Sequence, residues 1–284
     1  MPHILNALNG DRHVFAAELR PPRTQLALAE GMDAWIDTYH SIVGLTRRNR
    51  YVCLTDSAVG TAEEDNLRHL VANLQRDVPR ERIVPFLTSK HSRAYCLEYA
   101  ERARLSGFPA LVVLGGDRTV GPPRCVEHAY ELRQAIRTQA PDLVLGGWAN
   151  PHADPGRQVD YLLDAHFTAE FVLTQIVSHH DAAIVERFLA EVRRRNVPLP
   201  IVFGVFFYRS ATPRTLAMLR EFLPVPVDGL TREFAEGASP VEICARTIRV
   251  LGELGARHFY VSNLPLAGAA RTLEAIIDGA SAAR

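Results

Sequence analysis

Short, continuous apolar runs alternate along the chain with longer segments in which apolar residues recur every three or four positions. The short runs are typical of strands buried on both faces, as in a parallel sheet, and the longer segments of amphipathic helices. We predict strands at residues 14–18, 51–54, 82–87, 110–114, 143–148, 171–175, 200–207 and 258–261. We predict helices at residues 26–39, 62–74, 92–106, 123–138, 156–165, 181–196, 213–222, 239–254 and 269–279.

This alternation predicts an α/β fold with a parallel sheet. Eight strand–helix units within 284 residues favour a single (β/α)8 TIM barrel over a doubly wound sheet. The helix at 269–279 follows the eighth strand and is expected to close the barrel at the C-terminus. No linker, low-complexity run or charge block divides the chain, so we predict one catalytic domain over residues 1–284.

The charge balance argues against two classes of partner. The chain has 32 basic and 32 acidic residues, and a net charge of zero does not indicate nucleic acid or a membrane surface. No apolar stretch approaches the ~20 residues of a spanning helix, and the first residues do not resemble a signal peptide. We therefore expect a cytoplasmic protein with a small-molecule ligand, of an oligomeric state that the sequence does not indicate.

Metal and disulfide chemistry have little support in the spacing of the residues. The four cysteines form no CxxC pair, so neither a structural zinc site nor a disulfide framework is predicted. His179 and His180 are adjacent, but neighbouring side chains diverge on most backbones and no acid or cysteine stands at ligand spacing. We predict a turn or helix start there, and no metal site.

The first predicted strand ends in an acid. The segment VFAAELRPPR, residues 14–23, leads through small and apolar residues to Glu18, and Pro21 and Pro22 then stop the strand. A carboxyl group at a strand's C-terminal tip is well placed for proton transfer. The alternative is an ordinary surface acid paired with Arg20 or Arg23.

The other predicted strands also end in polar or aromatic residues. In a TIM barrel the carboxyl ends of the strands surround one opening, called the mouth below, where the chemistry takes place. The residues expected there are Glu18, Thr55, Asp56, Thr88, Asp117, Asn150, Gln175, Phe207, Tyr208, Arg209, Ser262 and Asn263. Lys90 is the only lysine available for a Schiff base, and no GxSxG elbow is present. The set favours hydrogen bonding to a polar heterocycle and proton donation over a covalent intermediate.

Four motifs, in order along the chain, resemble those of the methylenetetrahydrofolate reductase family. Residues 17–23 (AELRPPR) resemble its Glu-Phe-x-Pro-Pro-Arg motif, and residues 114–117 (LGGD) its Leu-Arg-Gly-Asp motif. Residues 169–175 (AEFVLTQ) are similar to Ala-Asp-Phe-x-x-Thr-Gln, and residues 258–263 (HFYVSN) to His-Phe-Tyr-Thr-x-Asn. The segment 148–151 (WANP) is a weaker fifth match. Each match falls on the strand expected for it.

The resemblance implies reduction of methylenetetrahydrofolate to methyltetrahydrofolate in one-carbon metabolism and methionine biosynthesis, with electrons from a nicotinamide cofactor. Glu18 would protonate a ring nitrogen of the folate, opening the five-membered ring to an iminium that accepts hydride. Asp117 would act with Glu18 as a catalytic residue and, like Gln175, would hydrogen-bond the pterin. An acid beside Asp117 and partly buried is expected to have a raised pKa, which suits a proton donor.

Each of the other predicted site residues is expected to contact either the folate or the cofactor. Folate contacts are expected from Gln175, Thr55, Asn150, Phe207 and Tyr208. Cofactor contacts are expected from Thr88, Gly115, Gly116, His258 and Asn263.

Departures from the family pattern bear on the cofactor, which in most of the family includes FAD. In an ungapped register, Asp164 stands where flavin-binding members usually carry a phosphate-contacting lysine, and Gly115 stands where they carry arginine. The segment 56–60 replaces their glycine-rich turn. An acid repels a pyrophosphate, so we expect a flavin-free branch with direct hydride transfer from NADH, NADPH being the other possible donor.

Three alternatives stay open. The first is the usual FAD-dependent reductase, and the second is a catalytically silent folate-binding protein, which has no need for Glu18. The third is an unrelated TIM-barrel lyase, which the missing metal ligands and lysine disfavour.

Overall fold

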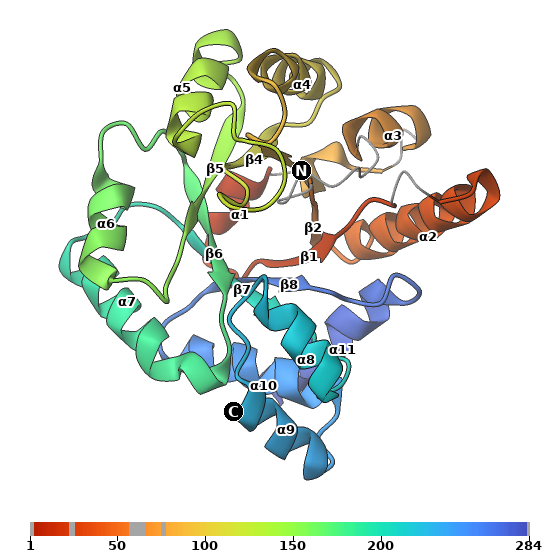
Figure 1. Ribbon diagram of the computed structural model, residues 1–284, viewed down its shortest axis with the longest axis vertical. Coiled ribbons are helices and arrows are strands. Elements are labelled where there is room, and N and C mark those ends of the chain that lie inside the picture. The colour runs from red at the N-terminus through yellow and green to blue at the C-terminus, as the bar shows by residue number, and fades with distance from the viewer. Residues whose placement is uncertain (1–2, 23–25, 57–65, 75–77, 283–284) are drawn as a thin grey trace.

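The strands form a closed parallel barrel in the order β1 to β8, and most of the helices lie around its outside (Figure 1). The computed structural model describes residues 3–22, 26–56, 66–74 and 78–282. The strands are β1 (Phe15–Leu19), β2 (Tyr51–Leu54), β3 (Ile83–Thr88), β4 (Ala110–Leu114), β5 (Val144–Ala149), β6 (Phe171–Ile176), β7 (Ile201–Phe206) and β8 (His258–Ser262). The predicted TIM barrel is confirmed, and each predicted strand lies within one residue of the observed one.

The helices follow the predicted order with two additions, α1 before the barrel and α9 after α8. They are α1 (Ile4–Leu8), α2 (Leu28–Thr46), α3 (Asn66–Asn73), α4 (Arg93–Leu105), α5 (Ala129–Gln139), α6 (Pro155–Leu163), α7 (Ala182–Arg194), α8 (Pro213–Arg220), α9 (Val227–Ala235), α10 (Pro240–Glu253) and α11 (Ala269–Ser281). Two short 3₁₀ turns are η1 (Arg80–Arg82) and η2 (His179–Asp181). The closing helix α11 packs on α10 and α2. No helix in these residue ranges is long and apolar enough to cross a membrane.

Within the described residues, two helices differ from their predicted bounds by more than two residues at one end. Helix α2 continues to Thr46, because Ser41 donates a hydrogen bond to the Leu266 carbonyl and Gly44 lets the helix pack closely on Ala270. Helix α5 starts at Ala129 rather than residue 123, where the Glu131 carboxylate accepts from the His128 backbone N–H in a capping box. Arg23, residues 57–60 and the predicted helix start at 62–65 lie outside the described residues.

Alternate residues of each strand divide between two hydrophobic layers. One layer fills the space between barrel and helices and contains Ala17, Val52 and Leu54. The other fills the barrel interior and contains Ala16, Cys53 and Tyr260 with their counterparts on the other strands. This period of two decides which strand-end side chains face the mouth.

The barrel interior is packed shut below the mouth. The Tyr260 hydroxyl donates to the Thr174 carbonyl at 2.6 Å, and its ring fills the space beside Gly204 that any larger side chain would occupy. At the amino-terminal end, Ile4 and Leu8 of α1 are buried in the same interior layer. Helix α1 thus packs against the interior layer at the end of the barrel opposite the mouth.

Candidate active site

Glu18 lies at the mouth, one residue before the end of β1, and points into the barrel. The register pairs Ala16 with Tyr260 and Ala17 with Val261, which sets Glu18 beside Ser262 on β8. The Ser262 hydroxyl donates to Oε1 of Glu18 at 2.8 Å. The carboxyl group is thus held in one orientation while the residue keeps partial exposure at the mouth.

Burial raises the pKa of the Glu18 carboxyl above its usual range. The hydrogen bond from Ser262 and the charge of Arg20 act in the opposite direction, with smaller effect. Its neighbours Cys53 and Tyr260 have their own pKa values raised, mainly by burial and in part by the charge of Glu18. Glu18 is therefore surrounded by groups that stay neutral, which favours its protonated form.

Asp117 lies in the loop after β4, and its environment shifts its pKa in the direction opposite to that of Glu18. Its Oδ1 accepts from the backbone N–H groups of Thr119 and Val120, at 2.7 and 2.9 Å, and from the Thr119 hydroxyl at 2.9 Å. These hydrogen bonds lower the pKa of Asp117. Asp117 is not among the groups that shift the pKa of Glu18. The raised pKa of Glu18 expected from the sequence is thus present, with burial as its cause rather than Asp117.

Lys90 fastens this loop to β3. The residue is buried, and its ammonium group donates to the carbonyls of Val120 and Pro122 at 2.7 and 2.8 Å. The chain's single lysine is therefore engaged in holding the segment that carries Asp117, and it is no Schiff-base candidate.

Two amide side chains lie at the ends of β5 and β6. The Asn150 side-chain oxygen accepts from the His152 backbone N–H at 3.1 Å, and the His152 ring contacts the Ile176 carbonyl at 2.9 Å. Oε1 of Gln175 accepts from the Ile176 backbone N–H at 2.9 Å. Both side-chain nitrogens lack a protein partner within the described residues, so both amides can donate to a ligand.

The end of β7 corrects one predicted contact. Phe206 and Tyr208 belong to the interior layer, with ring centroids 4.8 Å apart, whereas Phe207 packs in the outer layer against the helices. The prediction that Phe207 faces a folate is therefore wrong, because the strand alternation continues through residue 208. The Tyr208 hydroxyl is buried and has no hydrogen-bond partner in the described structure.

Two residues predicted to contact the cofactor, His258 and Thr88, do not present their side chains at the mouth. His258 is the first residue of β8, at the amino-terminal end of the barrel, where its Nδ1 accepts from the Val14 backbone N–H at 3.1 Å. Burial and the charge of Arg257 lower its pKa to about 4. Thr88 is fully buried and donates its backbone N–H and hydroxyl to Oδ2 of Asp56. Neither side chain is available to a ligand in this structure.

The other predicted residues lie around the mouth. Thr55 follows Cys53 on the inward face, and its backbone N–H donates to the Leu19 carbonyl. Asn263 is exposed, with φ of 66°, and its amide donates to the Phe207 carbonyl at 3.0 Å. Gly115 and Gly116 follow β4, and Gly116 has φ of 74°, a conformation that favours glycine.

The sequence matches the family "Methylenetetrahydrofolate reductase" over residues 3–222. The chain belongs to this family. No curated protein matches the sequence significantly.

Two solved structures extend the likeness to the fold. An uncharacterized protein from Clostridium thermocellum, described as binding two copies of 5-methyl-5,6,7,8-tetrahydrofolic acid, is 16% identical with a TM-score of 0.72. The match covers 97% of this chain and 98% of that one. A putative dihydrodipicolinate synthetase from Pseudomonas aeruginosa is 13% identical with a TM-score of 0.53, over 94% of this chain and 77% of that one. At these identities the likeness shows the fold alone.

The side chain of Arg124 lies beside residues 114–117, which match the Leu-Arg-Gly-Asp motif of the methylenetetrahydrofolate reductase family except at Gly115. A Cβ at Gly115 would lie 2.7 Å from Cζ and 2.8 Å from Nη1 of Arg124, and the Arg124 guanidinium donates to the Gly116 carbonyl. Arg124 thus fills the space that a side chain at residue 115 would occupy. A cation is present here although the family's motif arginine is missing.

Asp164, the second departure from the family pattern, follows the end of α6. Its Oδ1 accepts from the His166 backbone N–H at 2.7 Å and lies 3.0 Å from the His166 ring. These interactions lower the pKa of Asp164, so the exposed carboxylate is ionised near neutral pH.

Three inward-facing residues were given no role at the site by the sequence. Ser262 was placed at the mouth without a role, and Phe206 was passed over for Phe207. Trp148 is half-buried and packs against the interior layer at the mouth, on the strand opposite Glu18 in the eight-stranded barrel. Counting alternate residues back from each strand end would have shown that all three side chains face inward.

Proposed function

We propose that this protein reduces 5,10-methylenetetrahydrofolate to 5-methyltetrahydrofolate, with Glu18 as the proton donor and a nicotinamide as the hydride source. The observation that carries the proposal is the Glu18 carboxyl at the mouth. Burial raises its pKa, the Ser262 hydroxyl orients it, and the residue stays partly exposed. Family membership supports the reaction class. A protein of similar fold is described as binding two copies of the product, which supports a folate ligand.

Glu18 performs the proton transfer. It gives its proton to a nitrogen of the folate's five-membered ring, the bond from that nitrogen to the methylene carbon breaks, and an iminium cation forms. Hydride from NADH adds to the iminium carbon, giving the methyl group and NAD⁺. Glu18 regains its proton from water. The unpaired amide nitrogens of Asn150 and Gln175 hold acceptors of the pterin.

The hydride is proposed to pass directly, without a flavin. Asp164 supports this, because an ionised carboxylate would repel the flavin pyrophosphate at a position where flavin-binding members usually carry lysine. The second candidate is an FAD-dependent reductase, and Arg124 favours it, because its guanidinium supplies a cation beside Gly115. The two candidates make different predictions about the fate of a labelled hydrogen.

The direct and the FAD-dependent reactions can be distinguished with NADH that carries deuterium at the transferred position of C4. Direct transfer places the deuterium in the methyl group of the product, as mass spectrometry detects. A flavin intermediate would lose most of the label, because the hydrogen on reduced flavin N5 exchanges with water. A visible spectrum of the purified protein shows bound flavin independently.

NADH oxidation that depends on methylenetetrahydrofolate, with retained label and no flavin absorbance, is the expected result. Activity that appears only after FAD is added would refute direct transfer. Folate binding without oxidation of either NADH or NADPH would leave the silent folate-binding protein as the better description. Parallel assays with NADH and NADPH identify the preferred donor, which we propose is NADH.

A further inference from the structure

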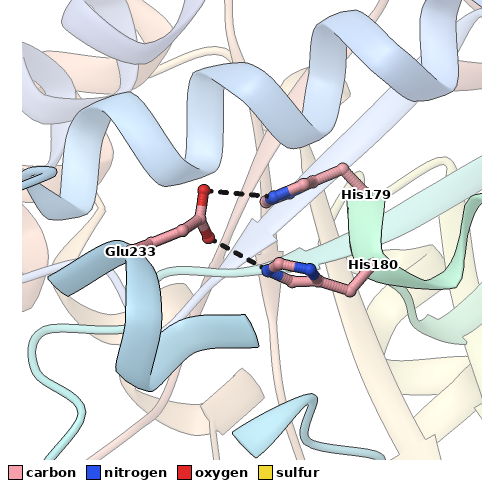
Figure 2. A group of neighbouring side chains, drawn as sticks. All are labelled: His179, His180 and Glu233. Carbon is pink, nitrogen blue, oxygen red and sulfur yellow. Dashed lines mark hydrogen bonds and ion pairs between the residues drawn. The ribbon is translucent and has the colours of Figure 1, made fainter. Parts of the chain in front are cut away.

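Two adjacent histidines and one buried glutamate form a cluster outside the candidate active site. Figure 2 shows His179 and His180 of η2 turned toward Glu233 of α9. Nε2 of His179 lies 3.2 Å from Oε1 of Glu233, and Nε2 of His180 lies 3.0 Å from Oε2. We call these three residues the His–His–Glu cluster.

The local fold turns both rings the same way. The backbone N–H and hydroxyl of Ser178 both donate to Oδ2 of Asp181, which closes η2 as a tight turn. The two imidazole centroids are then only 4.0 Å apart. On the facing helix, Gly229 leaves room for the His180 ring, which any side chain there would displace. The expectation from sequence that adjacent side chains diverge does not hold in this turn.

The third group comes from far along the chain. Glu233 is separated from His180 by 53 residues, so local spacing gave no sign of it. Its side chain is only 7% exposed, and buried carboxylates need cationic or hydrogen-bonding partners. The two histidines and Arg246 are the partners found in the described structure.

The donor atoms have the arrangement of a metal site. One ligand atom from each residue can be chosen so that all lie within 4.8 Å of one another. Tetrahedral Zn²⁺ with bonds of about 2.0–2.1 Å separates its ligand atoms by roughly 3.3 Å. Each histidine Nε2 lies near that separation from its own oxygen of Glu233, at 3.2 Å from Oε1 for His179 and at 3.0 Å from Oε2 for His180. The partly exposed His180 leaves one side open to solvent.

The surroundings of His179 also suit a ligand. Nδ1 of its ring lies 2.9 Å from the Thr247 hydroxyl, which in turn donates to the Ile243 carbonyl at 3.0 Å. With Nδ1–H donating to Thr247, the Nε2 lone pair faces Glu233 and is free for a cation.

We propose that the His–His–Glu cluster binds one Zn²⁺ ion, with solvent as the fourth ligand. Two imidazoles and one carboxylate are a ligand set that suits zinc. The ion would tie η2, just beyond Gln175 at the end of β6, to α9. Such a tie makes it a bracing site beside the mouth and leaves the proton transfer by Glu18 unchanged.

Arg246 is the cation with which zinc must compete. Its guanidinium contacts Oε1 of Glu233 and neutralises the buried carboxylate when no metal is bound. Its side chain is 42% exposed, so it can turn into solvent when a metal arrives. Removing Arg246 should therefore strengthen metal binding, whereas in a purely structural ion-pair network it would only weaken the network.

The test is a calorimetric titration of chelator-treated, full-length protein with Zn²⁺, supported by the visible absorption of a Co²⁺ complex. We expect one ion per chain, at least 100-fold weaker binding in His180→Ala and Glu233→Gln, and several-fold tighter binding in Arg246→Gln. His166→Ala, which alters an exposed histidine beside Asp164, is the matched control and should bind like the wild type.

Absence of one-to-one binding in the wild type would overturn the proposal, as would unchanged binding in His180→Ala. Weaker binding in Arg246→Gln would also refute it, because Arg246 would then support the site rather than compete for it. If Glu233→Gln does not fold, His180→Ala carries the test, since His180 lies at the surface and circular dichroism can verify its fold.

Discussion

Glu18 and Asp117 are both carboxylic acids near one mouth, and their environments drive their protonation in opposite directions. Glu18 is enclosed by Cys53, Tyr260 and one serine hydroxyl, and burial raises its pKa. Asp117 accepts two backbone N–H bonds and one hydroxyl in an open loop, and its pKa is lowered. The surroundings rather than the residue type thus raise the pKa of one acid and lower that of the other, and only the first is suited to donate a proton.

The largest expected effect comes from removing the proton of the enclosed acid. Glu18→Gln should lower kcat by about 1,000-fold, in the range typical of a lost general acid. Folate affinity should stay within a few-fold, because the amide keeps the size and the contact with Ser262. Stopped-flow NADH oxidation and equilibrium folate binding measure the two quantities. Near-normal turnover would assign the proton to another donor.

Protein stability provides the control for that variant. Ionising Glu18 is harder in the folded than in the unfolded chain, so the wild type loses stability as pH rises above the ordinary carboxyl pKa of 4.5. Glu18→Gln removes this penalty. Its Tm should therefore exceed that of the wild type by more at pH 8 than at pH 5, which excludes misfolding as the cause of lost activity.

A smaller effect is expected at the open acid. Asp117→Ala removes three hydrogen bonds that shape residues 117–120 and should raise the KM for folate by roughly tenfold. Asp117→Asn keeps an acceptor oxygen and should lie between this variant and the wild type. An equal loss of kcat in both variants, with KM unchanged, would instead give the charge of Asp117 a direct role in the chemistry.

Ser262→Ala tests the environment of Glu18 through the pH dependence of activity. The Ser262 hydroxyl lowers the pKa of Glu18, so its removal should raise that pKa further. In the proposed reaction the protonated acid is the active form, so we expect activity to fall as pH rises through the pKa of Glu18. The alkaline limb of the kcat/KM profile should move to higher pH in Ser262→Ala. Ser262→Thr keeps the hydroxyl and should restore the wild-type profile.

The smallest effect is expected from Arg20→Gln. Arg20 is exposed and acts on Glu18 only through its charge, the last of the three causes. The alkaline limb should move in the same direction as in Ser262→Ala, by less, and the difference should shrink at high salt. A larger shift than in Ser262→Ala would mean that charge rather than hydrogen bonding controls Glu18.

The barrel was predictable because its signals are local. Apolar runs end at prolines, glycines and acids, so strand bounds and the place of Glu18 could be read directly from the chain. Helix α9 was missed because Pro226 and Gly229 interrupt its apolar spacing. His258 was predicted to contact the cofactor, although a residue that starts a parallel strand lies at the end of the barrel opposite the mouth.

Most of the site features that could not be predicted from the sequence depend on contacts between segments that are far apart along the chain. The approach of Glu233 to two histidines depends on how α9 packs, and the pattern of residues near 179 carries no trace of it. The same holds for Arg124, whose side chain reaches back across the loop to Gly115. Phe207 differs, because the period of two was available and the aromatic pair was simply given one shared role.

The placement of Arg124 couples residue 115 to the backbone of its own loop. An arginine introduced at residue 115 would have its Cβ 2.7 Å from Cζ of Arg124, so the flexible end of Arg124 would have to swing away. That movement would break the hydrogen bond from the Arg124 guanidinium to the Gly116 carbonyl. A side chain at residue 115 would therefore exchange one cation beside this loop for another, and the Gly116 carbonyl would lose its hydrogen bond from Arg124 in the exchange.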